Sequence, residues 1–165
     1  MANKQKIEQR LCEVLGLEMA AQKAVEELSS KGLLDEGGIK SQLQGMKQEA
    51  NNHQTKIEQL VQSLSKSEGL DSKSIQEAAE ETEQKASEMM KTYLGEDPDT
   101  SEALDFLGLA EGGELIHYEG LSAMTQKGLK DPQAAATIQS ILEEEKKHLQ
   151  MCIELVKQNA VSSSS

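Results

Sequence analysis

The chain has 165 residues, enough for one domain with a single sizeable core, whereas two domains of this total length would each be marginal. Lysine and arginine number 17 against 29 aspartates and glutamates, and the resulting net charge of −12 disfavours binding to the phosphates of nucleic acids. No run approaches the roughly 20 apolar residues of a membrane helix, and residues 1–10 lack the apolar region of a secretion signal. We therefore expect a cytoplasmic protein that binds neither nucleic acid nor membranes.

The composition favours helix over sheet. The chain contains only two tyrosines, one phenylalanine and no tryptophan. Valine, isoleucine and threonine are sparse beside leucine, alanine, glutamate, glutamine and lysine, which are strong helix formers. Cys12 and Cys152 lie far apart and lack the spacing of a zinc finger, so we expect two reduced thiols. The predicted fold class is all-α.

Glycines, prolines and serines divide the chain into five predicted helices. The first covers about residues 4–31 and should end with Gly32 just beyond its last turn. The second covers about residues 39–67 and should end at Gly69 in the same way. A short loop separates them.

The third helix, residues 74–95, opens with a Ser-x-x-Glu pattern typical of a capping box. The fourth, residues 100–128, and the fifth, residues 131–158, each begin beside an aspartate that can cap the helix, and the fifth has a proline at its first helical position. We expect residues 1–160 to form one domain. The serine-rich residues 161–165 should form a disordered tail.

The loop lengths predict the order of packing. Short loops join the first helix to the second and the fourth to the fifth, so each pair should form an antiparallel hairpin. The long link between the hairpins carries the third helix, which would return the chain along the bundle and make the second and fourth helices parallel. We expect a four-helix bundle with one long crossover that carries an extra helix.

Acids and imidazoles interrupt the apolar seams of these helices. Glu18 interrupts the seam of the first helix, and His53 interrupts the second, with Glu49 one turn before it. Glu145 and His148 lie one turn apart in the seam of the fifth. Burying an unpaired carboxylate is costly, and a shared metal ion is an economical partner. A Glu-x-x-His pair aims an oxygen and a nitrogen at a common point between helices, and such mixed ligands suit Fe or Mn.

The fourth helix offers two alternative ligands. A weak internal symmetry between the hairpins aligns residues 17–18 with residues 118–119 and nominates Glu119. The most apolar stripe of the helix instead places Glu114 and His117 inside. We favour Glu119, because its own stripe contains small residues that would let helices approach closely, and we keep Glu114 and His117 in reserve.

Glu18, His53, the string IHYE at 116–119 and the string EEEKKH at 143–148 resemble the ferritin-like superfamily, especially rubrerythrins and the small bacterial stress-associated ferritin-like proteins. The resemblance spans most of the chain. It implies a bundle with a two-metal carboxylate site that holds iron or manganese, and often a dimer.

The chain departs from the family pattern at two positions. Ile116 stands where the family's EHYE string begins with glutamate, and Ala50 stands where the second helix commonly carries the glutamate of its Glu-x-x-His, with Glu49 one position early. The predicted metal ligands are Glu18, Glu49, His53, Glu119, Glu145 and His148, with Glu114 and His117 in reserve.

Two functions follow from these residues. The first is a ferritin-like metalloprotein, acting as a homodimer, that binds one or two Fe or Mn ions. By resemblance it would be a di-metal carboxylate oxidoreductase that reacts with peroxide or oxygen in a stress response. The alternative is a non-enzymatic helical-bundle dimer with a degenerate or empty metal site, which acts through protein partners.

Overall fold

The computed structural model describes residues 4–129 and 131–164, and these residues form five α-helices without any strand. The prediction of an all-α protein is confirmed. The helices are α1 (Lys4–Ser30), α2 (Ile39–Glu68), α3 (Ser72–Leu94), α4 (Thr100–Gly128) and α5 (Pro132–Ser162). Among the described residues, none of the helices combines the length and apolar character that crossing a membrane requires.

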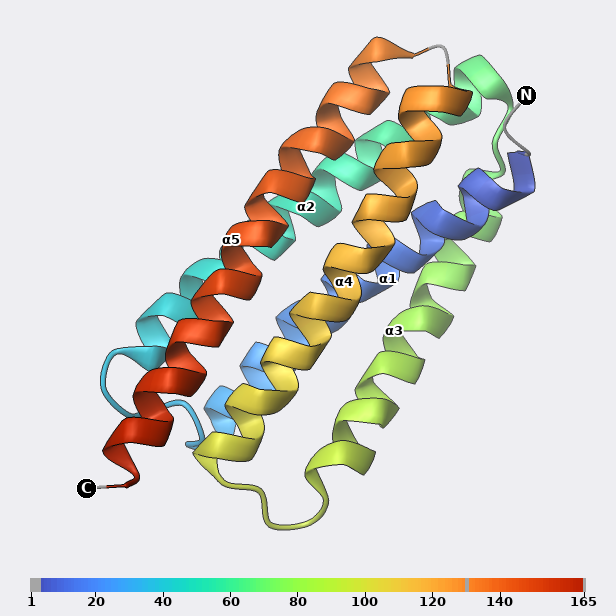
Figure 1. The fold of residues 1–165 in the computed structure, drawn as a ribbon. Helices are drawn as coiled ribbons and strands as arrows, with labels where there is room; N and C mark the ends of the chain where they lie inside the picture. The colour runs from blue at the N-terminus through green and yellow to red at the C-terminus, as the bar shows by residue number, and fades with distance from the viewer. Residues whose placement is uncertain (1–3, 130, 165) are drawn as a thin grey trace.

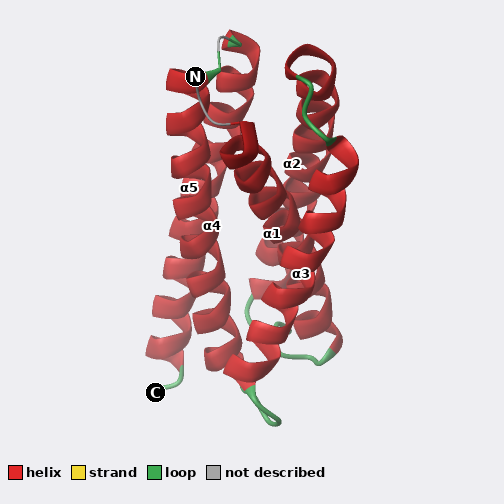
Figure 2. Ribbon diagram, turned by 90° about the vertical axis from the view of Figure 1, so that its right-hand side faces the viewer, coloured by secondary structure: helices red, strands yellow, loops and turns green. Residues whose placement is uncertain are grey.

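Four of the helices close around a common core, and α3 lies outside them. Helix α1 packs against α2 and α4, and α5 packs against α4 and α2, so each of the four touches two others. Helix α3 packs mainly against α1 (Figures 1 and 2). The chain runs in one direction in α1, α3 and α5 and in the opposite direction in α2 and α4 (Figure 1). Helices α2 and α4 are therefore parallel, and α3 returns the chain from the end of α2 to the start of α4.

Glycines end the first two helices. Gly32 has φ of 73°, its N–H donates to Ser29 O at 3.0 Å, and the N–H of Leu33 donates to Leu28 O at 3.1 Å. This pair of bonds satisfies carbonyls that the helix end would leave unpaired, and the left-handed φ suits glycine. Gly69 ends α2 with φ of 69°. Both predicted helix ends are confirmed.

The start of α3 differs from the prediction. The helix begins at Ser72, and its N-cap is Asp71, whose carboxylate accepts hydrogen bonds from the backbone N–H groups of Lys73 and Ser74. The predicted capping box at Ser74 is wrong, because the aspartate three residues earlier already binds the free N–H groups of the first turn. A capping box does form at the start of α4, between Asp99 and Glu102.

Helix α5 is longer than predicted. It continues past Gln158 to Ser162, so the expectation of a disordered tail is wrong for Val161 and Ser162. The hydroxyls of Ser162 and Ser163 donate to backbone carbonyls one turn earlier and extend the helical end. The last residue of the predicted tail, Ser165, lies outside the described residues.

The core consists of two apolar clusters separated by a polar layer. Along α1 the first cluster ends at Leu15 and the second begins at Ala24, with Glu18 between them. On α2, His53 lies between the clusters in the same way. Both cysteines are free, as predicted, and both are buried. The residues that we call the polar layer are Glu18, His53, Glu111, Glu114, Glu145 and His148.

Candidate metal centre

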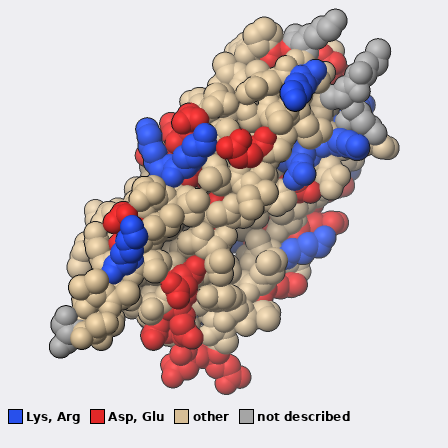
Figure 3. Space-filling model, viewed as in Figure 1, with Lys and Arg blue, Asp and Glu red and all other residues tan. Residues whose placement is uncertain are grey.

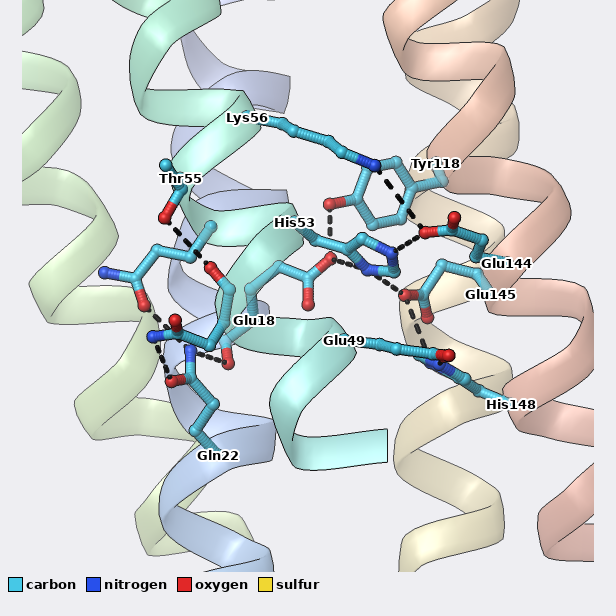
Figure 4. A network of polar contacts seen from close by, with 12 residues as sticks. Glu18, Gln22, Glu49, His53, Thr55, Lys56, Tyr118, Glu144, Glu145 and His148 are labelled. Atoms are coloured by element: carbon cyan, nitrogen blue, oxygen red, sulfur yellow. Dashed lines mark hydrogen bonds and ion pairs between the residues drawn. The ribbon is translucent and has the colours of Figure 1, made fainter. Parts of the chain in front are cut away.

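Each helix of the four-helix core contributes to the polar layer, and every member of the layer is buried. The first and second helices provide one residue each, Glu18 and His53, both fully buried at 0% exposure. Helices α4 and α5 provide two each, spaced by three residues so that both side chains of a pair face the same way. Mid-helix residues from opposite ends of the sequence thus meet at one level of the bundle (Figure 4).

His53 joins three of the four helices. Its Nδ1 lies 3.1 Å from Oε1 of Glu18 and 2.8 Å from Oε1 of Glu145 (Figure 4). Its Nε2 points the other way and contacts the carboxylate of Glu144 at the rim of the bundle. Nζ of Lys56 lies 3.8 Å from Oε2 of the same Glu144 carboxylate.

His148 repeats this arrangement from α5. Its Nδ1 lies 3.4 Å from Oε1 of Glu145 and 3.7 Å from Oε2 of Glu111, and its Nε2 contacts the carboxylate of Glu49. The rings of His53 and His148 are stacked, with centroids 5.6 Å apart. Both imidazoles therefore present Nδ1 inward to the polar layer and Nε2 outward to a rim carboxylate.

Burial and neighbouring charges raise the pKa of three carboxyl groups in the polar layer and lower the pKa of the fourth. Burial raises the pKa of Glu18 to about 7, although the hydrogen bond from His53 opposes this change. Burial raises the pKa values of Glu111 and Glu114 well above the usual range, and neighbouring glutamates add to the effect. Burial also disfavours ionised Glu145, but the contacts of His148 and His53 outweigh it and lower its pKa to about 2.

The same contacts raise the pKa values of the two imidazoles. Burial alone would lower the pKa of His53, but hydrogen bonds to Glu145 and Glu18 raise it to about 10. The pKa of His148 rises to about 9 for the same reason, with Glu145 as the main partner. The layer holds four buried glutamates against two histidines, so protons or a cation must balance its excess of carboxylate charge.

Two sets of side chains could each hold a metal ion. One set is His53, Glu145 and His148, the other is Glu18, Glu114 and Glu145, and within each set the potential ligand atoms lie within 4.8 Å of one another. Glu145 belongs to both sets.

Several carboxylate oxygens of these two sets are placed where they could bind a cation. Oε2 of Glu18, Oε1 of Glu114 and Oε2 of Glu145 are buried, and none accepts a hydrogen bond from the described residues, whereas Oε1 of Glu145 lies within ion-pair distance of Nδ1 of His53 and of His148. Such atoms are costly to bury unless something positive binds them. Imidazole nitrogen together with carboxylate oxygen is a donor set that suits Fe or Mn.

Helix α4 corrects the expectation for Glu119. The side chain of Glu119 is 56% exposed and lies 3.8 Å from Nζ of Lys146, whereas Glu114 is buried in the polar layer. Residues Glu114 and Tyr118 face inward one helical turn apart, so the adjacent Glu119 and Ile116 must face outward, and Ile116 is 70% exposed. The stripe of small residues that favoured Glu119 lies on the outside of the bundle.

Two other predicted residues lie at the rim. Glu49 has a side chain that is 54% exposed and touches the outer nitrogen of His148, so it meets a candidate ligand and not the ligand cluster itself. His117 is half-buried, and its Nδ1 lies 3.1 Å from both Oε2 of Glu13 and Nη1 of Arg10, away from the polar layer.

Glu111 and Glu144 were not among the residues predicted from the sequence for the metal site. Glu111 is buried in the layer one turn before Glu114. Its spacing of three and seven residues from Glu114 and Tyr118 is the helical signal that could have found it. Glu144 is only half-buried, and no periodicity marks it.

Comparisons of the chain with models of known protein families, with curated proteins and with solved structures found no match.

Proposed function

We propose that this chain is a ferritin-like metalloprotein that binds one or two Fe or Mn ions in the polar layer. The observation that carries the proposal is the position of Glu145, which belongs to both potential ligand sets. Its Oε1 lies 2.8 Å from Nδ1 of His53 and 3.4 Å from Nδ1 of His148, and its buried Oε2 accepts no hydrogen bond from the described residues. The pairing of α1 with α2 and α4, and of α5 with α4 and α2, supports a ferritin-like arrangement, as do the parallel α2 and α4.

The orientation of the imidazoles gives independent support. A histidine that binds a metal usually donates its other N–H to a carboxylate or carbonyl, which fixes the ring. His53 and His148 both meet that condition, because Nδ1 faces the layer while Nε2 contacts Glu144 or Glu49. Glu49 then serves to orient a ligand, although its sequence position suggested a ligand.

The proposed ligands are His53, His148, Glu145, Glu18 and Glu114. Tyr118 holds one oxygen of Glu18 and leaves the other free to bind. A bound Fe or Mn would supply the redox chemistry for a reaction with peroxide or oxygen, so the proposed activity is that of a di-metal carboxylate oxidoreductase. We further propose a homodimer, on the basis of the resemblance.

Metal analysis after equilibrium dialysis tests the proposal. Protein dialysed against Mn²⁺, or against Fe²⁺ without oxygen, should retain one or two equivalents. Glu145→Ala should abolish retention, and Glu114→Ala should reduce it, whereas the control Glu119→Ala, on the exposed side of the same helix, should leave it unchanged. Circular dichroism establishes that each variant is folded.

Retention of no metal by the folded wild type, or equal retention by wild type and Glu145→Ala, would reject the proposal. Anomalous scattering at the Fe and Mn edges should place the ions beside Glu145 in crystals.

A second function is favoured by one gap in the ligand set. Ala50 is buried on α2 one turn before His53, where a ligating glutamate would complete the set. Leu109, Ile116 and Ile153 are exposed apolar residues on α4 and α5 that could meet a partner. The alternative is a non-enzymatic helical-bundle dimer with an empty site. It predicts that a chelator leaves the melting temperature unchanged, whereas a bound metal should raise it.

A further inference from the structure

A groove of about 920 Å³ lies between α3 and α4, with α1 forming part of its lining. Helix α3 packs along α1 and meets α4 at few positions, which leaves the space open. A volume of this size lies within the range of small-molecule sites.

Small side chains keep the groove from being filled. Ala20, Ala21 and Ala24 line it from α1, and Ala110 and Gly113 line it from α4. None of these residues carries a side chain longer than a methyl group. The groove is therefore an extended apolar surface that an aliphatic chain could follow.

Two aromatic rings line one end of the groove, and acidic residues lie near that end. Tyr93 and Phe106 line this end, with ring centroids 5.5 Å apart. Acidic side chains gather around the nearby connection between α3 and α4 (Figure 3), where Glu96, Asp97 and Asp99 are exposed. The local charge attracts cations and repels anions.

Two buried carboxyl groups line the groove. Glu111 and Glu114 are at most 3% exposed, and Oε2 of Glu111 and Oε1 of Glu114 accept no hydrogen bond from the described residues. The distance of 3.7 Å from Glu111 to Nδ1 of His148 is too long for a hydrogen bond. Glu114 belongs to a potential metal set, but Glu111 belongs to neither, so the proposed function leaves Glu111 unexplained.

We infer that the groove binds a linear primary alkylamine, with its chain along the alanines and its ammonium group against Glu111. An ammonium has three donors and a positive charge, which match a buried carboxyl group with an oxygen that accepts no hydrogen bond from the described residues. The alkyl chain buries its apolar surface against the small residues of α1 and α4. The inference goes beyond the proposed function and needs no metal, although it would place the head group beside the proposed ligands.

Calorimetric titration of the metal-free protein with decylamine, below its micelle concentration, tests the inference. We expect one molecule to bind per chain and sodium decanoate to bind at least about tenfold more weakly. Glu111→Gln, which keeps the side-chain volume, should weaken decylamine binding by about tenfold, because an amide cannot form an ion pair with the ammonium group.

Filling the groove provides a matched pair of variants on α4. Ala110→Phe should abolish decylamine binding, whereas Ala123→Phe, at an exposed position outside the groove, should preserve it. If Ala110→Phe does not fold, Ala21→Leu fills the same space from α1. Failure of the wild type to bind decylamine, equal binding of decanoate, or unchanged binding in the folded groove-filling variant would overturn the inference. Because these titrations contain no metal, their failure leaves the metal proposal untouched.

Discussion

The hydroxyl of Tyr118 donates a hydrogen bond of 2.6 Å to Oε1 of Glu18, and both side chains are fully buried. This bond ties α4 to α1 at the border between the polar layer and an apolar cluster. It also holds one oxygen of a carboxylate that forms a potential ligand set with Glu114 and Glu145, while the other oxygen, Oε2, accepts no hydrogen bond from the described residues. Tyr118 thus both packs in the core and orients a proposed ligand.

Removing this hydroxyl should destabilise the protein without opening a large cavity. We expect Tyr118→Phe to lower the free energy of unfolding by about 1–3 kcal/mol, because a buried carboxylate loses a donor. Urea denaturation measures the change. The control is Tyr93→Phe, at a side chain that is half exposed, and it should have little effect. Equal effects of the two substitutions would contradict a special role for the bond.

Removing a histidine of the polar layer should lower the free energy of unfolding more than removing the tyrosine hydroxyl. In metal-free protein, His53→Ala should cost about 3–5 kcal/mol of unfolding free energy, because it leaves Glu18 without its cationic neighbour and leaves Glu145 with only His148. His117→Ala, at the half-buried histidine beside Glu13, should cost less than about 1 kcal/mol. Urea denaturation in the presence of a chelator compares the two. A loss at His53 no larger than the loss at His117 would show that the polar layer needs no buried cation.

The sequence predicted much of the fold because local chemistry decides the helix ends. Gly32 and Gly69 end their helices because a left-handed residue is needed there. Asp71 was not predicted as the N-cap of α3, because two residues near the start of that helix, Asp71 and Ser74, could both serve as caps. Only the structure reveals which side chain binds the free N–H groups.

The candidate site was predictable where one acid or imidazole interrupted a clear apolar seam, as at Glu18 and His53. Helix α4 was harder, because glycines and apolar residues lie on both its inner and outer faces, so its weak periodicity did not distinguish Glu114 from Glu119. The contact between Glu49 and His148 joins residues far apart in the sequence. Such a pairing depends on how α2 and α5 pack, which no local pattern contains.

The shifted pKa values predict how the stability of metal-free protein depends on pH. Glu18 has a pKa raised from 4.5 to about 7, so the folded protein keeps a proton that the unfolded chain has lost in that window. His53, raised from 6.5 to about 10, and His148, raised to about 9, do the same at higher pH. Because the folded state binds more protons, its stability must fall as pH rises from about 4.5 to about 10.

Glu145 acts in the opposite sense at low pH. Its pKa is lowered to about 2, so the stabilisation it provides is lost as pH falls from about 4.5 toward that value. Thermal melts in a chelator should therefore show a maximum in mild acid and a steady decline toward alkaline pH. His53→Ala should flatten the decline above neutral pH, because it removes the group whose proton is held most tightly there. A melting temperature that stayed level or rose from mild acid to alkaline pH would contradict the arrangement of charges in the polar layer.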